Sequence, residues 1–278
     1  MKDTLSMGIS PCPNDTYIFH ALVERLIALP CAFELLMADV EELNGRALAG
    51  SLDVTKLSLG AMARLADEYV LLRAGAALGR GCGPLVVARH PMTVQDLANA
   101  TVAIPGRWTT ANLLLSLHGG FTGKRFEMLF DKVMPAVAAG SVDCGVVIHE
   151  GRFTYPEHGL HLVLDLGQWW EGHTGMPLPL GGIAVRRSLG RETALLVEDA
   201  IRRSLAHANS NPEASRGFIK QHAQELADTV IDSHIRTFVN DFSLELGPEG
   251  QDAIRLLVAK AAEMAGRQEP LPSLFVGG

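Results

Sequence analysis

The sequence lacks the features that mark several large classes of protein. Lys and Arg form no basic run, and acidic residues outnumber basic ones, 31 to 24, for a formal charge of −7. A nucleic-acid surface needs clustered cations, so we expect no nucleic-acid partner. No uncharged apolar stretch approaches the ~18 residues that a membrane-spanning helix needs, so we expect no membrane span. The first residues lack the apolar core of a secretory signal peptide, which predicts a cytoplasmic protein.

Cysteine is scarce, and the common cofactor motifs are missing. The four cysteines (Cys12, Cys31, Cys82 and Cys144) form no Cys-x-x-Cys pair, so we expect reduced thiols. The glycine-rich segment at 79–83 precedes a predicted strand instead of opening a helix, unlike a dinucleotide-binding turn. The His and Glu residues between 149 and 161 lack the spacing of a zinc site, and there is no P-loop and no Gly-x-Ser-x-Gly turn. We therefore expect a reaction that uses no nucleotide, redox cofactor or metal.

What is present is the pattern of an α/β protein. Hydrophobic residues make up 47% of the chain and charged residues 20%, as in ordinary globular proteins. Strand and helix patterns alternate through most of the chain, which predicts largely parallel sheets. The segment Ala49–Asp53 recurs as Ala139–Asp143, 90 residues later, and each copy ends a predicted helix and opens a strand. This repeat favours two similar lobes, although five common residues can also coincide by chance.

The predicted elements fall into an α/β part followed by a helical part. Strands are expected at 4–9, 33–37, 53–58, 70–74, 85–88, 101–104, 125–130, 144–148, 160–164 and 182–185. Helices are expected at 40–49, 110–117, 132–139, 193–208, 213–222, 229–239 and 249–265, besides a first helix that runs through Leu29, stops at Pro30 and is capped by Asn14 or Asp15. The segment Gly167–Gly181 is expected to be a loop, and the tail from Gln268 to be extended and docked by Leu274 and Phe275.

Three polar segments follow predicted strands, where open α/β sheets bind ligands. Ser10–Thr16 and Gly106–Thr110 each open a helix, whose first backbone N–H groups suit a carboxylate. In the third segment, a buried strand ends in His149 and Glu150, and an imidazole there can act as a base or an acid. Each segment also has a plainer interpretation: a helix cap for the first two, and a structural histidine for the third.

Two further groups of side chains could contact a ligand. Lys56 and Ser58 flank Leu57 in a strand, so they share one face of the sheet and could grip a carboxylate or a developing enolate. An edge salt bridge is the alternative for Lys56. Trp169 and Trp170 could stack on a planar ligand or could pack between lobes.

At these segments the chain closely resembles the 1,4-dihydroxy-6-naphthoate synthases of the futalosine route to menaquinone. The resemblance rests on six motifs that occur in register over nearly the whole chain: Ser-Pro-Cys-Pro-Asn-Asp-Thr (10–16), Thr-Lys-Leu-Ser (55–58), Gly-Pro-Leu-Val-Val-Ala-Arg (83–89), Pro-Gly-Arg-x-Thr-Thr (105–110), Ile-His-Glu-x-Arg-Phe-Thr-Tyr-Pro (148–156) and Gly-x-Pro-Leu-Pro-Leu-Gly (175–181). A sister family with the same fold makes an earlier intermediate, but the first and fifth motifs point to the synthase. Tyr17 stands where Phe is more usual and adds a hydroxyl near the proposed site.

The resemblance implies a two-lobed fold like the type II periplasmic binding proteins, in which each lobe is a β-sheet flanked by helices and the ligand lies between the lobes. One lobe is expected to comprise residues 1–86 and 188–278, and the other residues 87–187, with crossing strands near 85–89 and 182–187. Closure of the lobes is expected to exclude water and orient the scissile bond.

The resemblance also implies a reaction. Cyclic dehypoxanthinylfutalosine is cleaved to 1,4-dihydroxy-6-naphthoate and a three-carbon sugar fragment, dihydroxyacetone, in a carbon–carbon lyase reaction that starts by removal of a proton beside a carbonyl. By matching position, His149 is the base. The expected substrate contacts are Lys56, Leu57, Ser58, Thr109, Thr110, Asn14 and Asp15. No cofactor is expected.

Two other functions share the pattern. A solute-binding protein for a small carboxylate would have this fold without catalysis, although the missing export signal counts against it. A ligand-sensing domain of a regulator is the third possibility, although no DNA-binding segment is attached. The sequence assigns no oligomeric state, no resting lobe angle, no order of bond breaking, and no roles to Cys12, Arg152, Trp169 or Trp170.

Overall fold

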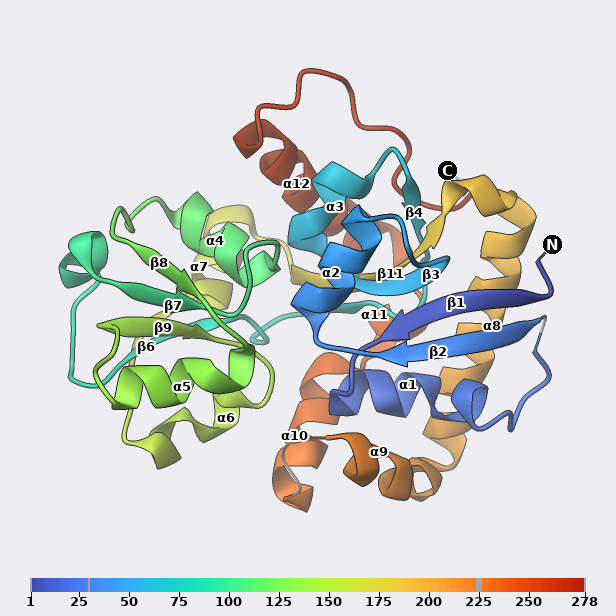
Figure 1. The fold of residues 1–278 in the computed structure, drawn as a ribbon, viewed down its shortest axis with the longest axis horizontal. Coiled ribbons are helices and arrows are strands. Elements are labelled where there is room, and N and C mark those ends of the chain that lie inside the picture. The colour runs from blue at the N-terminus through green and yellow to red at the C-terminus, as the bar shows by residue number, and fades with distance from the viewer. Residues whose placement is uncertain (1, 30, 224–226, 278) are drawn as a thin grey trace. The chain divides into compact units, whose positions relative to one another are not determined.

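The computed structural model describes residues 2–29, 31–223 and 227–277 and divides the chain into two compact units. The larger unit comprises Met1–Gly79 and Pro179–Gly278, and the smaller unit comprises Arg80–Leu178. Each unit is a mixed β-sheet with helices on its faces (Figure 1). The expected α/β class, with two lobes that each hold a flanked sheet, is confirmed.

The sheet of the larger unit has strand order β2-β1-β3-β11-β4, and β5 pairs with β11. Strands β1, β2 and β3 are parallel, whereas β11 runs antiparallel to β3 and β4. The strands of this sheet are β1 (Thr4–Ile9), β2 (Ala32–Met37), β3 (Val54–Ser58), β4 (Tyr69–Leu71), β5 (Ala77–Gly79) and β11 (Leu178–Arg186). The helices of the unit are α1 (Pro13–Val23), α2 (Val40–Leu48), α3 (Leu59–Leu65), α8 (Gly190–Ser210), α9 (Arg216–His222), α10 (Asp228–Phe238), α11 (Asp241–Leu244) and α12 (Gly247–Met264), with short 3-10 turns at Arg187–Leu189 and Pro212–Ser215.

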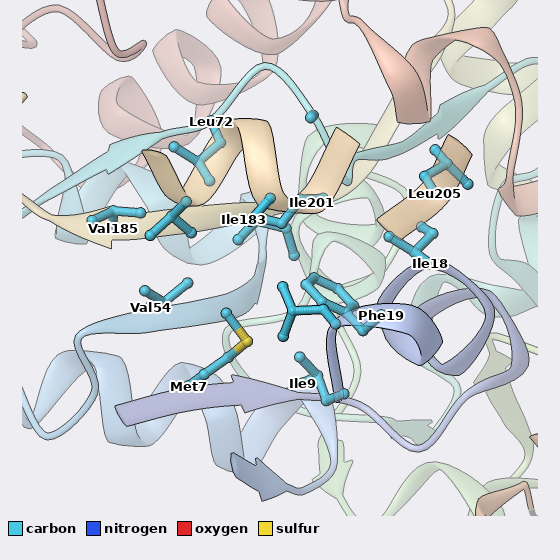
Figure 2. Close-up of a cluster of buried hydrophobic side chains, with 14 of the residues drawn as sticks. Met7, Ile9, Ile18, Phe19, Val54, Leu72, Ile183, Val185, Ile201 and Leu205 are labelled. Atoms are coloured by element: carbon cyan, nitrogen blue, oxygen red, sulfur yellow. The ribbon is translucent and has the colours of Figure 1, made fainter. Parts of the chain in front are cut away.

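The main core of this unit lies between its sheet and the helices α1 and α8. Its buried side chains include Met7 and Ile9 of β1, Val54 of β3, Phe19 of α1 and Ile201 of α8 (Figure 2). The opposite face of the sheet is covered by α2 and α3. A Cβ added at Gly8 of β1 would lie within 3 Å of Leu43 and Leu52 side-chain carbons, which shows how closely α2 packs there.

The sheet of the smaller unit has strand order β10-β6-β9-β7-β8. Strands β7, β8 and β9 are parallel, and β6 and β10 complete a mixed sheet. The strands are β6 (Leu85–Ala88), β7 (Val102–Ile104), β8 (Arg125–Glu127), β9 (Cys144–Val147) and β10 (His161–Asp165). The helices are α4 (Thr110–His118), α5 (Phe130–Ala138), α6 (Gly151–Thr154) and α7 (Leu166–Thr174), with 3-10 turns at Gln95–Asn99 and Tyr155–His158. Helix α5 packs Val133 and Val137 into the core of the unit.

Two predictions about the first helix are wrong. The helix begins at Pro13 with Cys12 at the N-cap, so Asn14 and Asp15 lie inside its first turn instead of capping it. A proline at the first helical position has its φ angle already set for a helix, which explains the earlier start. The helix also ends at Val23, because Arg25 adopts a left-handed φ of 55° and the chain turns toward β2. The expected stop at Pro30 lies outside the described residues.

The expected loop at 167–181 is also wrong, because α7 occupies its first half. Both ends of the helix have recognisable signals: the carboxylate of Asp165 accepts hydrogen bonds from the backbone N–H of Gly167 and Gln168, and Gly175 is left-handed at φ 70°.

Three further differences concern the other elements. The sheets are mixed, whereas largely parallel sheets were expected. The strand expected at 125–130 ends at Glu127, and α3 was not expected.

Two other expectations, about the repeat and the tail, are confirmed. The repeat at Ala49 and Ala139 ends α2 and α5 and leads into β3 and β9. The tail docks as expected, since Phe275 forms a parallel bridge with Leu71 and is buried together with Leu274. None of the described helices is long and apolar enough to cross a membrane.

Candidate active site

In the larger unit, the carboxylate of Asp15 is the centre of a buried polar cluster. Asp15 is fully buried at the start of α1. Its Oδ2 accepts from the backbone N–H of Ser10 at 3.1 Å, and its Oδ1 accepts from Asn14 Nδ2 at 2.9 Å and from Lys56 Nζ at 2.5 Å. The first turn of a helix also favours a negative charge. Asp15 therefore holds the turn before α1 against the end of β3.

Lys56 reaches Asp15 from the face of the sheet that packs on α1. Its side chain is only 6% exposed. Gly181 of β11 leaves room for it, because a Cβ at that position would lie 3.0 Å from Lys56 Cε. An ammonium group has three N–H donors, and Asp15 takes one of them. The buried ion pair with Asp15 thus holds the ammonium group of Lys56 in place.

Leu57 and Ser58 complete this strand end. Leu57 pairs with Gly182 of β11, on the face of the sheet opposite Lys56. The backbone N–H of Ser58 donates to Asn44 Oδ1 at 2.9 Å, and its hydroxyl donates to the carbonyl of Leu180 at 3.5 Å. The structure thus brings Asn14, Asp15 and Lys56 into one cluster, places Ser58 at the same strand end, and turns the Leu57 side chain away.

In the smaller unit, Thr109 and Thr110 begin α4 directly after β7. Thr109 is the N-cap: its hydroxyl accepts from the backbone N–H of Asn112 at 3.2 Å and donates to the carbonyl of Gly106 at 2.8 Å. Both threonines are buried. The capping interpretation of Thr109 is therefore correct. Its own hydrogen bonds fix the loop before α4, and the N-terminal end of a helix favours an anion.

His149 lies just after β9, at the same sheet edge as the start of α4, because β7 and β9 are neighbouring parallel strands. Its backbone is left-handed, with φ 54°, which is uncommon outside glycine and costs of order 1–3 kcal/mol. The half-buried ring meets the edge of Phe130 at 5.0 Å between centroids. Arg25, at the end of α1, has the same conformation, and strain of this kind occurs at turns as well as at functional sites.

Arg152 clamps the segment that carries His149. Its Nη1 donates to the carbonyl of Gly83 at 2.5 Å, and its Nη2 donates to Asp165 Oδ2 at 2.9 Å. The backbones meet closely here, since a Cβ on Gly83 would lie 2.3 Å from Gly167 Cα. Arg152 therefore joins the end of β9, the entry to β6 and the start of α7.

The remaining residues singled out in the sequence have structural partners. Trp170 is buried and donates from Nε1 to the carbonyl of Pro177 at 3.2 Å, whereas Trp169 is partly exposed beside His118 and His173. The extra hydroxyl of Tyr17 donates to Asn209 Oδ1 of α8 at 3.1 Å.

The buried thiols of Cys82 and Cys144 are not suited to nucleophilic attack. Burial raises the pKa of Cys82 and of Cys144 to about 12, so both stay protonated at neutral pH. Among the residues that the structure describes, no three His, Cys, Asp or Glu side chains gather as metal ligands would.

Sequence reasoning missed two buried residues that support the larger unit's cluster. Asn44 binds the backbone of Ser58, and Nε2 of His234 lies 3.0 Å from Asn14 Oδ1. Both occupy apolar positions of amphipathic helices: Asn44 follows Val40 at helical spacing, and His234 lies between Ile231 and Phe238. A polar residue at a core position was the signal that could have found them.

The chain matches known proteins over nearly its full length. The family model for menaquinone biosynthesis matches residues 5–263. A 1,4-dihydroxy-6-naphthoate synthase of Thermus thermophilus is 51% identical over 99% of this chain and 100% of the relative. A protein of the same name from Streptomyces coelicolor is 45% identical over 94% of this chain and 93% of the relative.

Solved structures agree with the fold. Protein AF1704 from Archaeoglobus fulgidus has a TM-score of 0.89 and 34% identity, covering 95% of this chain and 98% of that one. The periplasmic aliphatic sulphonate binding protein SsuA from Escherichia coli has a TM-score of 0.67 and 15% identity, covering 98% and 91%, and at that identity it shows the fold alone. With its two flanked sheets and this similarity, the chain has a periplasmic-binding-protein-like fold and belongs to the menaquinone biosynthesis family.

Proposed function

We propose that this protein is a 1,4-dihydroxy-6-naphthoate synthase, which converts cyclic dehypoxanthinylfutalosine to 1,4-dihydroxy-6-naphthoate and dihydroxyacetone. The full-length similarity to synthases of that name supports the reaction. The observation that carries the chemistry is His149, a half-buried imidazole held in a strained backbone at the end of β9. We assign the enzyme to the carbon–carbon lyases and to the cytoplasm.

His149 acts as the base in this proposal. It removes a proton beside a carbonyl, the electron pair left behind drives the elimination, and formation of an aromatic ring favours the products. Such a fragmentation divides one molecule into two, so the protein's task is to move a proton and hold the substrate. One well-placed base commonly contributes ~10²–10⁴-fold in rate. Phe130 and the Arg152 clamp keep the imidazole in place.

The proposed substrate contacts form one group in each unit. In the larger unit, Lys56, Ser58, Asn14 and Asp15 serve the substrate through their side chains, and Leu57, whose side chain lies on the opposite face of the sheet, serves it through its backbone. Lys56 and Asn14 offer N–H donors to oxygen atoms, and Asp15 orients Lys56. In the smaller unit, Thr109, Thr110 and the first backbone N–H groups of α4 offer a site for a carboxylate. The donors in both groups are fixed by their own hydrogen bonds before substrate arrives, which lowers the entropy cost of binding.

The test is direct. Purified protein is incubated with cyclic dehypoxanthinylfutalosine, and the naphthoate is followed by its absorbance. We expect turnover without an added cofactor. The alternative is a solute-binding protein for a small carboxylate, which the names of the curated relatives do not favour. A wild-type protein that binds the substrate tightly and never turns it over would support that alternative and reject the synthase.

A further inference from the structure

The buried histidine His234 contacts the proposed substrate site from a distant part of the chain. It lies on α10, which packs beside α1 (Figure 1). Its side chain is fully buried, and its Nε2 is 3.0 Å from Asn14 Oδ1, across 220 residues of sequence. The helical part of the chain thus reaches the cluster formed by Asn14, Asp15 and Lys56.

The hydrogen-bond network determines the direction of this contact. The carboxylate of Asp15 can only accept, so the group of Asn14 that faces it at 2.9 Å is the amide Nδ2. The amide oxygen of Asn14 then faces His234. An oxygen needs a donor, so Nε2 of His234 carries a proton. The reverse orientation of Asn14 would set its oxygen against the carboxylate, which is repulsive.

A single directed chain of hydrogen bonds follows from this assignment. His234 donates to Asn14, Asn14 donates to Asp15, and Lys56 donates to the same Asp15 oxygen. Asn14 has no rotational freedom left, because both ends of its amide are held. Lys56 is held through Asp15, whose second oxygen is occupied by the backbone N–H of Ser10.

We propose that His234 is a positioning residue for substrate binding, which acts through Asn14 and Asp15 to hold the amide of Asn14 and the ammonium of Lys56 in the orientation that the substrate requires. This proposal rests on the proposed function, since it assumes that Asn14 and Lys56 contact the substrate. A fully buried imidazole is costly to desolvate, and a hydrogen bond from its Nε2 to the amide oxygen of Asn14 offsets part of that cost. Packing alone at this position, between Ile231 and Phe238, would be served by an apolar side chain.

The experiment compares two polar replacements of the same residue. In His234→Gln the side-chain amide nitrogen can occupy the position of Nε2 and donate to Asn14. In His234→Asn the amide is too short to reach that position. The steady-state kcat and KM for naphthoate formation are measured for both, with thermal unfolding as the measure of folding. We expect KM to rise about tenfold in His234→Asn, as loss of one buried hydrogen bond predicts, with kcat within about threefold, and His234→Gln to recover most of the wild-type KM.

His20→Gln is the matched control. His20 is a buried histidine on the neighbouring helix α1, but its ring contacts Phe218 instead of Asn14. We expect its KM to stay at the wild-type value even if its unfolding temperature falls. Equal KM values in wild type, His234→Gln and His234→Asn would overturn the positioning role, as would equal increases in both variants.

A second measurement separates the contact with Asn14 from any general effect of the substitutions on folding. In an Asn14→Ala background, the hydrogen bond from residue 234 has no acceptor, so His234→Gln and His234→Asn should give the same KM. A tenfold difference that persists in this background would overturn the proposal. A wild-type protein that forms no naphthoate would instead reject the proposed function, and with it this role of His234, so the two failures are distinguishable.

Discussion

The two units build the same turn and then use it for different chemistry. In each, Ala-Gly-Ser follows the end of a helix, and the next strand begins after two further residues. Gly50 and Gly140 are both left-handed, with φ of 63° and 72°. A Cβ on Gly50 would lie 2.9 Å from the guanidinium of Arg186, and one on Gly140 would lie 2.8 Å from that of Arg89. Arg186 ends β11 and Arg89 follows β6. Each turn is therefore covered by the guanidinium of an arginine from the end of a strand.

The aspartates that close these turns are also equivalent. Asp53 exchanges hydrogen bonds with Ser6, and Asp143 exchanges them with Thr101. Each aspartate thereby ties the start of one parallel strand to its neighbour. The repeat in the sequence is thus a repeat of a complete hydrogen-bonded connection, not a coincidence of common residues.

The difference appears at the opposite ends of the same strands. At the end of β3 the larger unit presents Ser58 and Lys56, the latter held by a buried ion pair, whereas after β9 the smaller unit presents His149 with a left-handed backbone. The first turn of α1 is fixed by the carboxyl group of Asp15, and that of α4 by the hydroxyl of Thr109. The site residues of the larger unit are therefore held by a buried ion pair, whereas His149 of the smaller unit is held by its backbone conformation.

The largest expected effect comes from removing the imidazole. His149→Asn should lower kcat by about 10²–10⁴-fold, because the base is lost, and should leave substrate binding within a few-fold of wild type. Asparagine adopts left-handed backbone readily, so the variant keeps the local geometry. Stopped assays give kcat, and titration of the variant with substrate gives Kd.

His158→Asn is the control for this variant, since His158 is exposed on the same unit. It should retain wild-type kcat. If His149→Asn also retains wild-type kcat, the base lies elsewhere and the strain at His149 has another cause. Comparison of the pH–rate profiles of wild type and His149→Asn shows whether the pH dependence of the reaction changes when the imidazole is removed.

The second prediction compares the free energy of unfolding that is lost with a buried charge and with a neutral helix cap. Lys56→Met leaves the Asp15 carboxylate buried without its cation and should cost about 3–5 kcal/mol of unfolding free energy. Thr109→Val removes the cap of α4 and should cost about 0.5–2 kcal/mol. Denaturant unfolding measures both. The three tryptophans, Trp108, Trp169 and Trp170, all lie in the smaller unit, so their fluorescence follows that unit while circular dichroism follows the whole chain.

The double variant Asp15→Asn with Lys56→Met separates charge from packing. It removes both charges, so it should be more stable than Lys56→Met alone. In Lys56→Met, the unfolding transition should begin at a lower denaturant concentration by circular dichroism than by tryptophan fluorescence. A Lys56→Met protein that is no less stable than Thr109→Val would contradict the contrast between the units.

Sequence patterns predicted the elements that are governed by local rules. Strand Thr4–Ile9 and the start of α4 at Thr110 were predicted correctly, because alternation and capping are local. Helix α7 was missed, because its glycines suggested a loop and its cap, Asp165, lies at the end of a strand that the pattern placed one residue early. The polar residues of the site were found by their position after strands, but their pairing was not.

The contacts that organise the site come from distant parts of the sequence. Lys56 and Asp15 are 41 residues apart, and His234 and Asn14 are 220 apart. Nothing in the spacing of a single sequence predicts which buried polar groups will meet. That information lies in the order of the strands, which brings β1 and β3 together and sets α10 against α1.

The smallest expected effect tests whether the aspartates of the two repeated turns contribute equally to the free energy of unfolding. Hydrogen bonds from Thr101 hold the pKa of Asp143 below its usual value; burial alone would raise the pKa of Asp53, but hydrogen bonds from Lys2 and Ser6 lower it. A carboxyl whose pKa is lower in the folded state stabilises the fold above its unfolded pKa of about 3.9, and this contribution disappears as pH falls through the folded pKa.

Asp53→Asn and Asp143→Asn should therefore both be less stable than wild type at pH 7, and both deficits should shrink as the pH falls below about 4. The Asp53 side chain is only 10% exposed, whereas Asp143 is exposed, so screening by water should make the deficit larger for Asp53. Chemical unfolding from pH 7 to pH 3 measures the comparison. Equal deficits would mean that strand tethering outweighs burial, and a deficit that persists at low pH would mean that packing, not charge, makes these aspartates stabilising.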